Sequence, residues 1–137
     1  MEPEQQNGKT VAEALVSRLQ PGTEDVVEDG YDTLAANKFQ VPEGVSEHAF
    51  QIPPEVWSYT LSICTFVGGI FADAAKDVVK KRLSKYLEDF LKKKKPLDRD
   101  QQGELLKFVE TQGSKLRIPS SHRKKLEGDL RRLFAES

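Results

Sequence analysis

The sequence predicts an all-α fold, a small helical domain with a long central helix and a partly disordered acidic N-terminal region. Three observations lead to this prediction. Apolar residues recur at helical spacing over residues 54–95, and no proline interrupts the segment after Pro54. The segments 98–112 and 120–135 have the same spacing and follow plausible N-cap residues. The alternation typical of a β-strand is confined to a short stretch around Phe39 and Val41.

Residues 1–50 are expected to form the acidic, partly disordered region, with one short helix at 10–19. Thr10 is its predicted N-cap, and Glu13, three residues later, completes a capping box. A weaker helix is expected near residues 31–38. Proline and glycine residues follow, as in a loop.

Residues 51–137 are expected to form the helical domain, which begins with the long helix at about 54–95. Proline suits the first turn of a helix, and Pro96 prevents the helix from continuing. Gly68 and Gly69 lie inside this segment, so it forms either one helix or two helices with a break at the glycine pair. A small and polar stripe from Ser58 through Gly69 to Lys80 keeps helical phase across that pair.

The segments 98–112 and 120–135 are expected to form a C-terminal helical pair that packs on the central helix. Asp98 or Asp100 would begin the first helix, and Ser120 or Ser121 would cap the second. The predicted core places residues of the central segment (Trp57, Ile63, Phe66, Val67, Ile70 and Phe71) against residues of the pair (Leu105, Val109, Leu130 and Phe134).

The net charge of −1 conceals a strong asymmetry between the two halves of the chain. Residues 1–75 contain three basic and twelve acidic residues, a net charge of −9, whereas residues 76–137 contain eighteen basic and ten acidic residues, a net charge of +8. Such asymmetry is typical of proteins that bind an oppositely charged surface. The alternative is that the two halves neutralise each other within the fold.

The sequence favours a non-enzymatic protein without a cofactor or a metal site. It contains no nucleophile elbow, phosphate-binding loop, zinc-protease motif or dinucleotide fingerprint. The single cysteine, Cys64, excludes an internal disulfide, and neither His48 nor His122 has partners at metal-ligand spacing. The acidic N-terminal sequence lacks the features of a signal peptide. We therefore expect a cytoplasmic protein, with membrane association as the alternative.

Three functions are compatible with this pattern. The leading hypothesis is an interaction module that binds a protein partner or self-associates through the apolar central helix and the basic C-terminal half. The first alternative is a membrane-associated or membrane-perturbing protein that inserts the uncharged residues 56–72 and binds anionic headgroups through lysines. The second is a nucleic-acid binder without sequence preference. The candidate interaction residues are Gly68, Phe71, Ala72, Lys92, Lys93, Lys94, Lys95, Arg123, Lys124 and Lys125.

Overall fold

The computed structural model describes residues 3–36, 58–72, 74–116 and 118–136. These residues form a small domain of six α-helices without β-strands, which confirms the predicted all-α class. The helices are α1 (Pro3–Leu19), α2 (Glu24–Ala36), α3 (Tyr59–Phe71), α4 (Val78–Leu91), α5 (Arg99–Gln112) and α6 (Ser120–Ala135).

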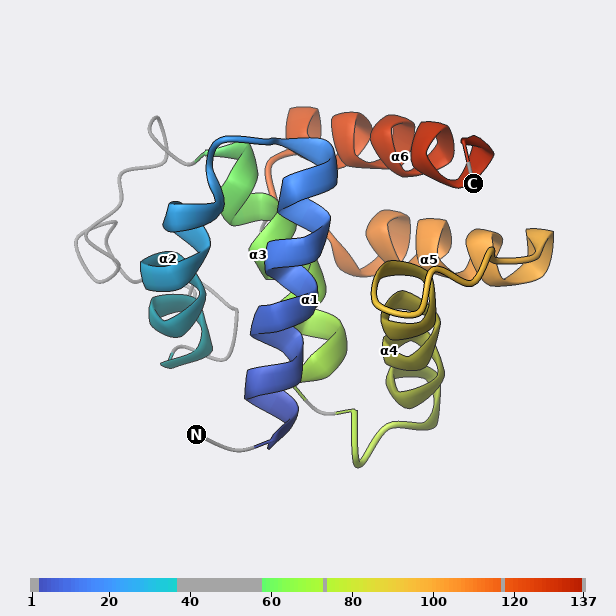
Figure 1. The fold of residues 1–137 in the computed structure, drawn as a ribbon, viewed down its shortest axis with the longest axis horizontal. Coiled ribbons are helices and arrows are strands. Elements are labelled where there is room, and N and C mark those ends of the chain that lie inside the picture. Colours follow the sequence, from blue (N-terminus) through green and yellow to red (C-terminus); the bar gives the residue numbers. More distant parts are fainter. Residues whose placement is uncertain (1–2, 37–57, 73, 117, 137) are drawn as a thin grey trace.

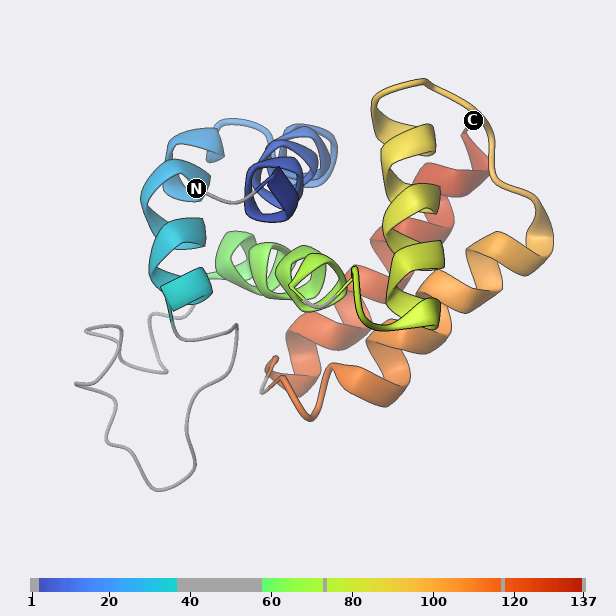
Figure 2. The same ribbon diagram turned by 90° about the horizontal axis from the view of Figure 1, so that it is seen from below.

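Helix α3 lies at the centre of the fold. Helices α1 and α2 pack on one side of it, and α4, α5 and α6 lie on the other (Figures 1 and 2). All thirteen of its residues are buried. A helix that is apolar around its whole circumference is stable in water only when neighbours cover every face. The high apolar content of this segment thus accounts for its central position.

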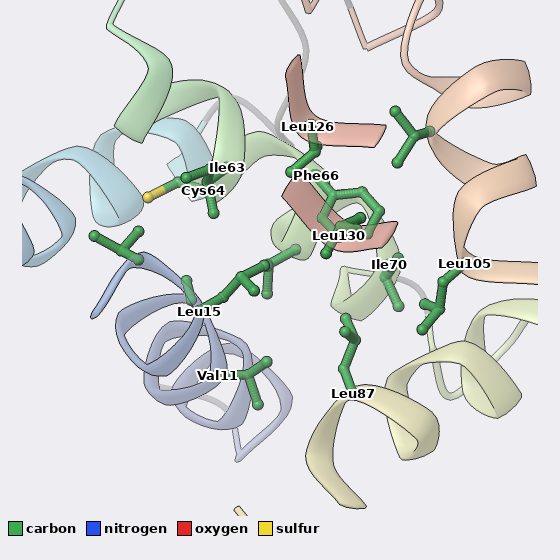
Figure 3. Packing of buried hydrophobic residues seen from close by; sticks show 14 of the residues in the cluster. Val11, Leu15, Ile63, Cys64, Phe66, Ile70, Leu87, Leu105, Leu126 and Leu130 are labelled. Atoms are coloured by element: carbon green, nitrogen blue, oxygen red, sulfur yellow. The ribbon is translucent and has the colours of Figure 1, made fainter. Parts of the chain in front are cut away.

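The core extends from α3 in both directions, toward the N-terminal helices and toward the C-terminal ones. Figure 3 shows Val11 and Leu15 of α1 on one side, and Leu87, Leu105 and Leu130 on the other. The predicted core residues of α3, α5 and α6 are all buried, as expected from the sequence. Trp57 lies outside the described residues.

The expected helix at 54–95 is divided into two helices, and the break is not at the glycines. Gly68 and Gly69 lie within α3, which ends at Phe71. The connection reaches Asp77, whose side chain accepts a 3.1 Å hydrogen bond from the backbone N–H of Lys80 and caps α4. An aspartate cap satisfies an otherwise unpaired N–H and so favours a new helix start at this position.

The polar stripe of the central segment does not face solvent along α3. Ser62, Thr65 and Gly69 are all buried. The Thr65 hydroxyl donates a 2.9 Å hydrogen bond to the Leu61 carbonyl oxygen within the helix. Small side chains whose polar atoms are satisfied locally can be buried without a large free-energy cost, so helical phase alone did not reveal which side is exposed.

The N-terminal region is more ordered than expected up to residue 36. Helix α1 begins at Pro3, so Thr10 lies inside a helix and the predicted capping box is wrong. Lys9 and Gly8 are buried against the neighbouring helices. These tertiary contacts stabilise helical turns that the local sequence does not predict. The remainder of the acidic region, residues 37–50, lies outside the described part, together with its predicted partial disorder.

The two C-terminal helices agree closely with the predicted ranges. Asp98 caps α5 and forms a capping box with Gln101. Helix α6 begins at Ser120, but Pro119 occupies the N-cap position and no side chain caps the helix, so the predicted serine cap is wrong. Within the described ranges no helix is both long and apolar enough to cross a membrane.

Candidate functional site

A groove of about 550 Å³ lies between α4 and α5. Val79, Leu83 and Phe108 give it an apolar component. Lys80, Arg82 and Lys107 contribute positive charge, and Asp77, Glu104, Thr111 and Gln112 complete the lining. Val79 is the exposed apolar side chain of this lining, since Leu83 and Phe108 are buried, and charged and polar groups make up the rest.

Two exposed valines lie at the start of α4, beside this groove. The side chain of Val78 is 77% exposed and that of Val79 is 49% exposed. Leu83 and Leu87 occupy the buried face of α4. Because residues 78 and 79 are adjacent on a helix, both cannot point toward the core. Exposed apolar side chains next to a groove are a feature of binding surfaces.

The charges around the groove are mostly positive. Arg82 Nε donates a 3.0 Å hydrogen bond to Glu104 Oε2, and this pair connects α4 to α5. Lys107 is exposed on α5, whereas Lys81 of α4 lines a separate hollow beside Phe71 and Ala74. The pair stabilises the two helices only modestly, since both partners are solvent-exposed. The lining thus holds three positive charges, on Lys80, Arg82 and Lys107, against the two negative charges of Asp77 and Glu104.

A second polar site lies between α3 and α6, and it is packed rather than open. Tyr59 donates a 2.8 Å hydrogen bond to Asp129 Oδ2, and Ser62 Oγ lies 2.8 Å from His122 Nδ1. The rings of Tyr59 and His122 meet edge to face, with centroids 5.7 Å apart. Lys125 Nζ lies 4.4 Å from the centroid of the Tyr59 ring. These contacts connect the first three turns of α6 to the start of the central helix.

Burial sets the protonation of this polar site. It raises the pKa of Tyr59, and the hydrogen bond to Asp129 raises that pKa further, so the phenol stays neutral. Burial and the nearby charge of Lys125 lower the pKa of His122. Although Ser62 and His122 are in contact, Ser62 is fully buried. This arrangement is typical of a packed polar contact, whereas a reactive serine would be accessible to a substrate.

Cys64 lies in the core, where Figure 3 shows it beside Ile63 on α3. Burial raises the pKa of its thiol to about 12, so the thiolate required of a nucleophile is scarce at neutral pH. His122 is hydrogen-bonded to Ser62. The second histidine, His48, lies outside the described residues.

The residues predicted to mediate interactions fall into three separate places. Gly68 and Phe71 are buried in α3, and Ala72 is half-buried at its end, because the surrounding helices cover the apolar segment. These three residues therefore belong to the core and its edge and do not form an open surface. The four lysines at positions 92–95 are exposed in the α4–α5 connection, and the basic residues 123–125 lie at the start of α6.

The two lysine-rich segments do not combine into one surface. Figure 2 places the connection between α4 and α5 and the beginning of α6 at opposite ends of the C-terminal layer. Arg123 also has a structural role, because its Nε donates a 3.1 Å hydrogen bond to the Ile118 carbonyl oxygen. Sequence reasoning missed the α4–α5 groove. The sequence feature that could have indicated this groove is the pair of adjacent valines before a basic run, "DVVKKR".

The residues that the structure places contain no group of three or more histidine, cysteine, aspartate or glutamate side chains that could hold a metal ion. Comparison of the chain with protein-family models, with curated protein sequences and with solved structures gives no match.

Proposed function

We propose that this protein is a non-enzymatic interaction module that binds an acidic, amphipathic helical segment of a protein through the α4–α5 groove. The observation that carries the proposal is the groove itself, where the exposed valines Val78 and Val79 adjoin a lining with more basic than acidic side chains. The proposed binding surface thus lies in the basic C-terminal half of the chain. Binding there does not require the buried central helix α3 to become exposed.

The chemistry of the groove indicates the chemistry of the partner. Apolar side chains spaced along one face of a partner helix could cover Val79 and Phe108, as helix-in-groove recognition requires. Carboxylates on the same helix could lie near Lys80 and Lys107, which speeds encounter and fixes orientation. A basic partner would instead place like charges together, which is unfavourable.

A peptide-binding experiment tests this proposal. The probe is a labelled synthetic helix with apolar residues at i, i+4 and i+7 and glutamate elsewhere, and its control has lysine in place of glutamate. We expect the acidic probe alone to bind in fluorescence anisotropy. We also expect Lys107→Glu, inside the groove, to weaken binding by roughly tenfold, equivalent to about 1.4 kcal/mol. The matched variant Lys115→Glu makes the same charge change outside the groove and should have little effect.

The same variants separate this function from its alternatives. If Lys107→Glu and Lys115→Glu weakened binding equally, the attraction would be one of overall charge and the groove would not be the site. If a short oligonucleotide or vesicles containing anionic lipid bound while the acidic probe did not, the proposal of a protein-binding module would be contradicted. Binding to either polyanion would also fall steeply with salt.

A further inference from the structure

Each end of the molecule exposes apolar side chains. The charges around them are negative at one end and positive at the other. Among the described residues, the large hydrophobic side chains with substantial exposure are Val26, Val78 and Val79. Val26 lies on α2, whose net charge is negative, and the other two lie at the basic start of α4. An apolar anchor is therefore present on each of two oppositely charged helices.

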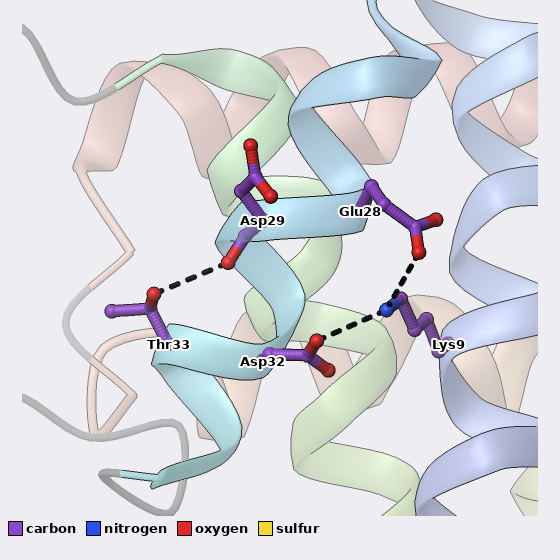
Figure 4. A network of polar contacts seen from close by, with 5 residues as sticks. All are labelled: Lys9, Glu28, Asp29, Asp32 and Thr33. Carbon is purple, nitrogen blue, oxygen red and sulfur yellow. Dashed lines mark hydrogen bonds and ion pairs between the residues drawn. The ribbon is translucent and has the colours of Figure 1, made fainter.

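The exposed face of α2 is acidic and carries an apolar side chain, as the proposed partner of the α4–α5 groove should. Val27, Tyr31 and Leu34 are buried toward the core, so Asp25, Val26 and Asp29 lie on other faces and are exposed. Figure 4 shows that Glu28 and Asp32 turn toward Lys9, whereas Asp29 turns away from it.

Within one molecule, α2 and the groove are far apart. Figures 1 and 2 both place α2 at one end of the long axis and α4 and α5 at the other, with α1 and α3 between them. The two charged surfaces therefore cannot neutralise each other inside one copy. Each copy presents one acidic surface and one basic surface at opposite ends.

We propose that the protein self-associates head to tail, with the exposed acidic face of α2 from one copy docking on the α4–α5 groove of the next. This inference rests on the proposed function and names a second copy of the chain as the partner. Val26 of one copy covers Val78 and Val79 of the next, and Asp25 and Asp29 approach Lys80 and Lys107 of the groove. Because the two surfaces differ, the contact is heterologous, and it forms a ring or an open chain of copies.

Sedimentation of the full chain tests this arrangement. We expect the average mass to rise with protein concentration and to fall with added salt, since exposed charges are screened. One variant blocks the acidic surface (Val26→Ser with Asp29→Asn), and another blocks the basic surface at the groove (Val79→Ser with Lys107→Gln). All four positions are exposed, so both variants should keep the fold.

Mixing the two variants is the decisive step. Each variant alone should stay monomeric, because every contact needs one intact surface of each kind. An equimolar mixture retains one intact acidic surface and one intact basic surface per pair, so it should form a one-to-one dimer that does not grow. A symmetric interface would not produce this result.

Two results would overturn head-to-tail association: a wild-type chain that stays monomeric at every concentration, or a mixture that fails to form the dimer. In either case, the acidic probe peptide is added to the monomeric variant with the blocked α2 surface. If the probe binds there, the groove remains a binding site for another protein and only the self-association is wrong. If the probe also fails to bind, the proposed function fails as well.

Discussion

The acidic N-terminal half and the basic C-terminal half of the chain, called here the acidic end and the basic end, bury charges of opposite sign, and each buried charge is opposite to the net charge of its half. At the acidic end, Lys9 is only 8% exposed and lies 3.2 Å from Glu28 Oε1 and 3.1 Å from Asp32 Oδ2 (Figure 4). At the basic end, Asp129 is also 8% exposed and is bonded to Tyr59 and Arg132. A buried charge is tolerated only where opposite charges or hydrogen bonds stabilise it.

The two ends differ in how well water can reach the partner groups that are left when the buried charge, Lys9 or Asp129, is removed. The carboxylates around Lys9 have side chains that are 65% and 50% exposed, so water can solvate them in the absence of the lysine. The hydroxyl of Tyr59 is buried and has Asp129 as its acceptor. The polar contacts of the basic end should therefore contribute more to stability than those of the acidic end.

The largest expected effect comes from the helix that both ends share. Phe66 is fully buried in α3 and meets Phe108 edge to face, with ring centroids 6.0 Å apart. Phe66→Ala should lower the free energy of unfolding by about 3–5 kcal/mol because it leaves a cavity. Denaturation monitored by circular dichroism would measure this. Val78→Ala, on the surface, is the control and should change stability little; a similarly small effect of Phe66→Ala would argue against one shared core.

A pair of substitutions compares the two buried charges directly. Asp129→Ala should cost about 1–3 kcal/mol because the Tyr59 hydroxyl loses its acceptor in a buried site. Lys9→Met should cost less, since methionine keeps the packing of the lysine stem and the two carboxylates left behind are exposed to water. Denaturant titration measures both. Equal losses at the two ends would contradict the proposed difference.

A double-mutant cycle identifies the source of the loss at the basic end. If the unpaired Tyr59 hydroxyl is responsible, Asp129→Ala should cost much less in a Tyr59→Phe background than in the wild type. A cost that does not depend on the Tyr59 hydroxyl would attribute the loss to Arg132 or to packing.

The fold class and most of the C-terminal half could be predicted from the sequence, because their signals are local. Asp98 caps α5, and the apolar spacing at Leu126, Leu130 and Leu133 defines the buried side of α6. The early start of α1 could not be predicted in this way, since contacts with distant helices stabilise it. The groove depends on how α4 and α5 pack against each other, and neither helix specifies this alone.

Another comparison uses two buried glycines, Gly8 in α1 and Gly69 in the central helix α3. A Cβ atom at Gly8 would contact the Tyr31 hydroxyl and lie 3.0 Å from Phe71 Cβ, whereas one at Gly69 would lie 2.6 Å from the Leu116 Cδ1 methyl. Leu116 is half-buried and can rotate away more easily than a packed aromatic ring. Gly8→Ala should therefore cost about 1–3 kcal/mol through overpacking.

The Gly69→Ala substitution should destabilise the fold less than Gly8→Ala. The better helix propensity of alanine, about 1 kcal/mol, offsets part of the strain against Leu116. We expect Gly69→Ala to change the free energy of unfolding by less than about 1 kcal/mol in either direction. Thermal unfolding of both variants, measured side by side, checks the order. A larger loss for Gly69→Ala than for Gly8→Ala would show that the α5–α6 connection is the more rigid of the two contacts.

The smallest expected effect is a pH dependence that originates at the basic end. Burial and Lys125 lower the pKa of His122 below its ordinary value of 6.5, so the unfolded chain binds a proton at this site more readily than the folded one. Stability contributed by neutral His122 is therefore complete above pH 6.5 and decreases as the pH falls from 6.5 toward the lower pKa of the folded state. The charged ring would also lie in the first turn of α6, where the helix dipole disfavours a cation.

Replacement of each histidine in turn assigns this pH dependence. His122→Gln removes the titrating group and keeps a side chain that can hydrogen-bond to Ser62, so the slope of stability against pH just below 6.5 should become flatter. His48→Gln is the matched control, because the chain has two histidines. Denaturant titrations at several pH values measure the slope. If the control removed the slope and His122→Gln did not, the pH sensitivity would belong to His48, and the α3–α6 contact would be insensitive to acid in this range.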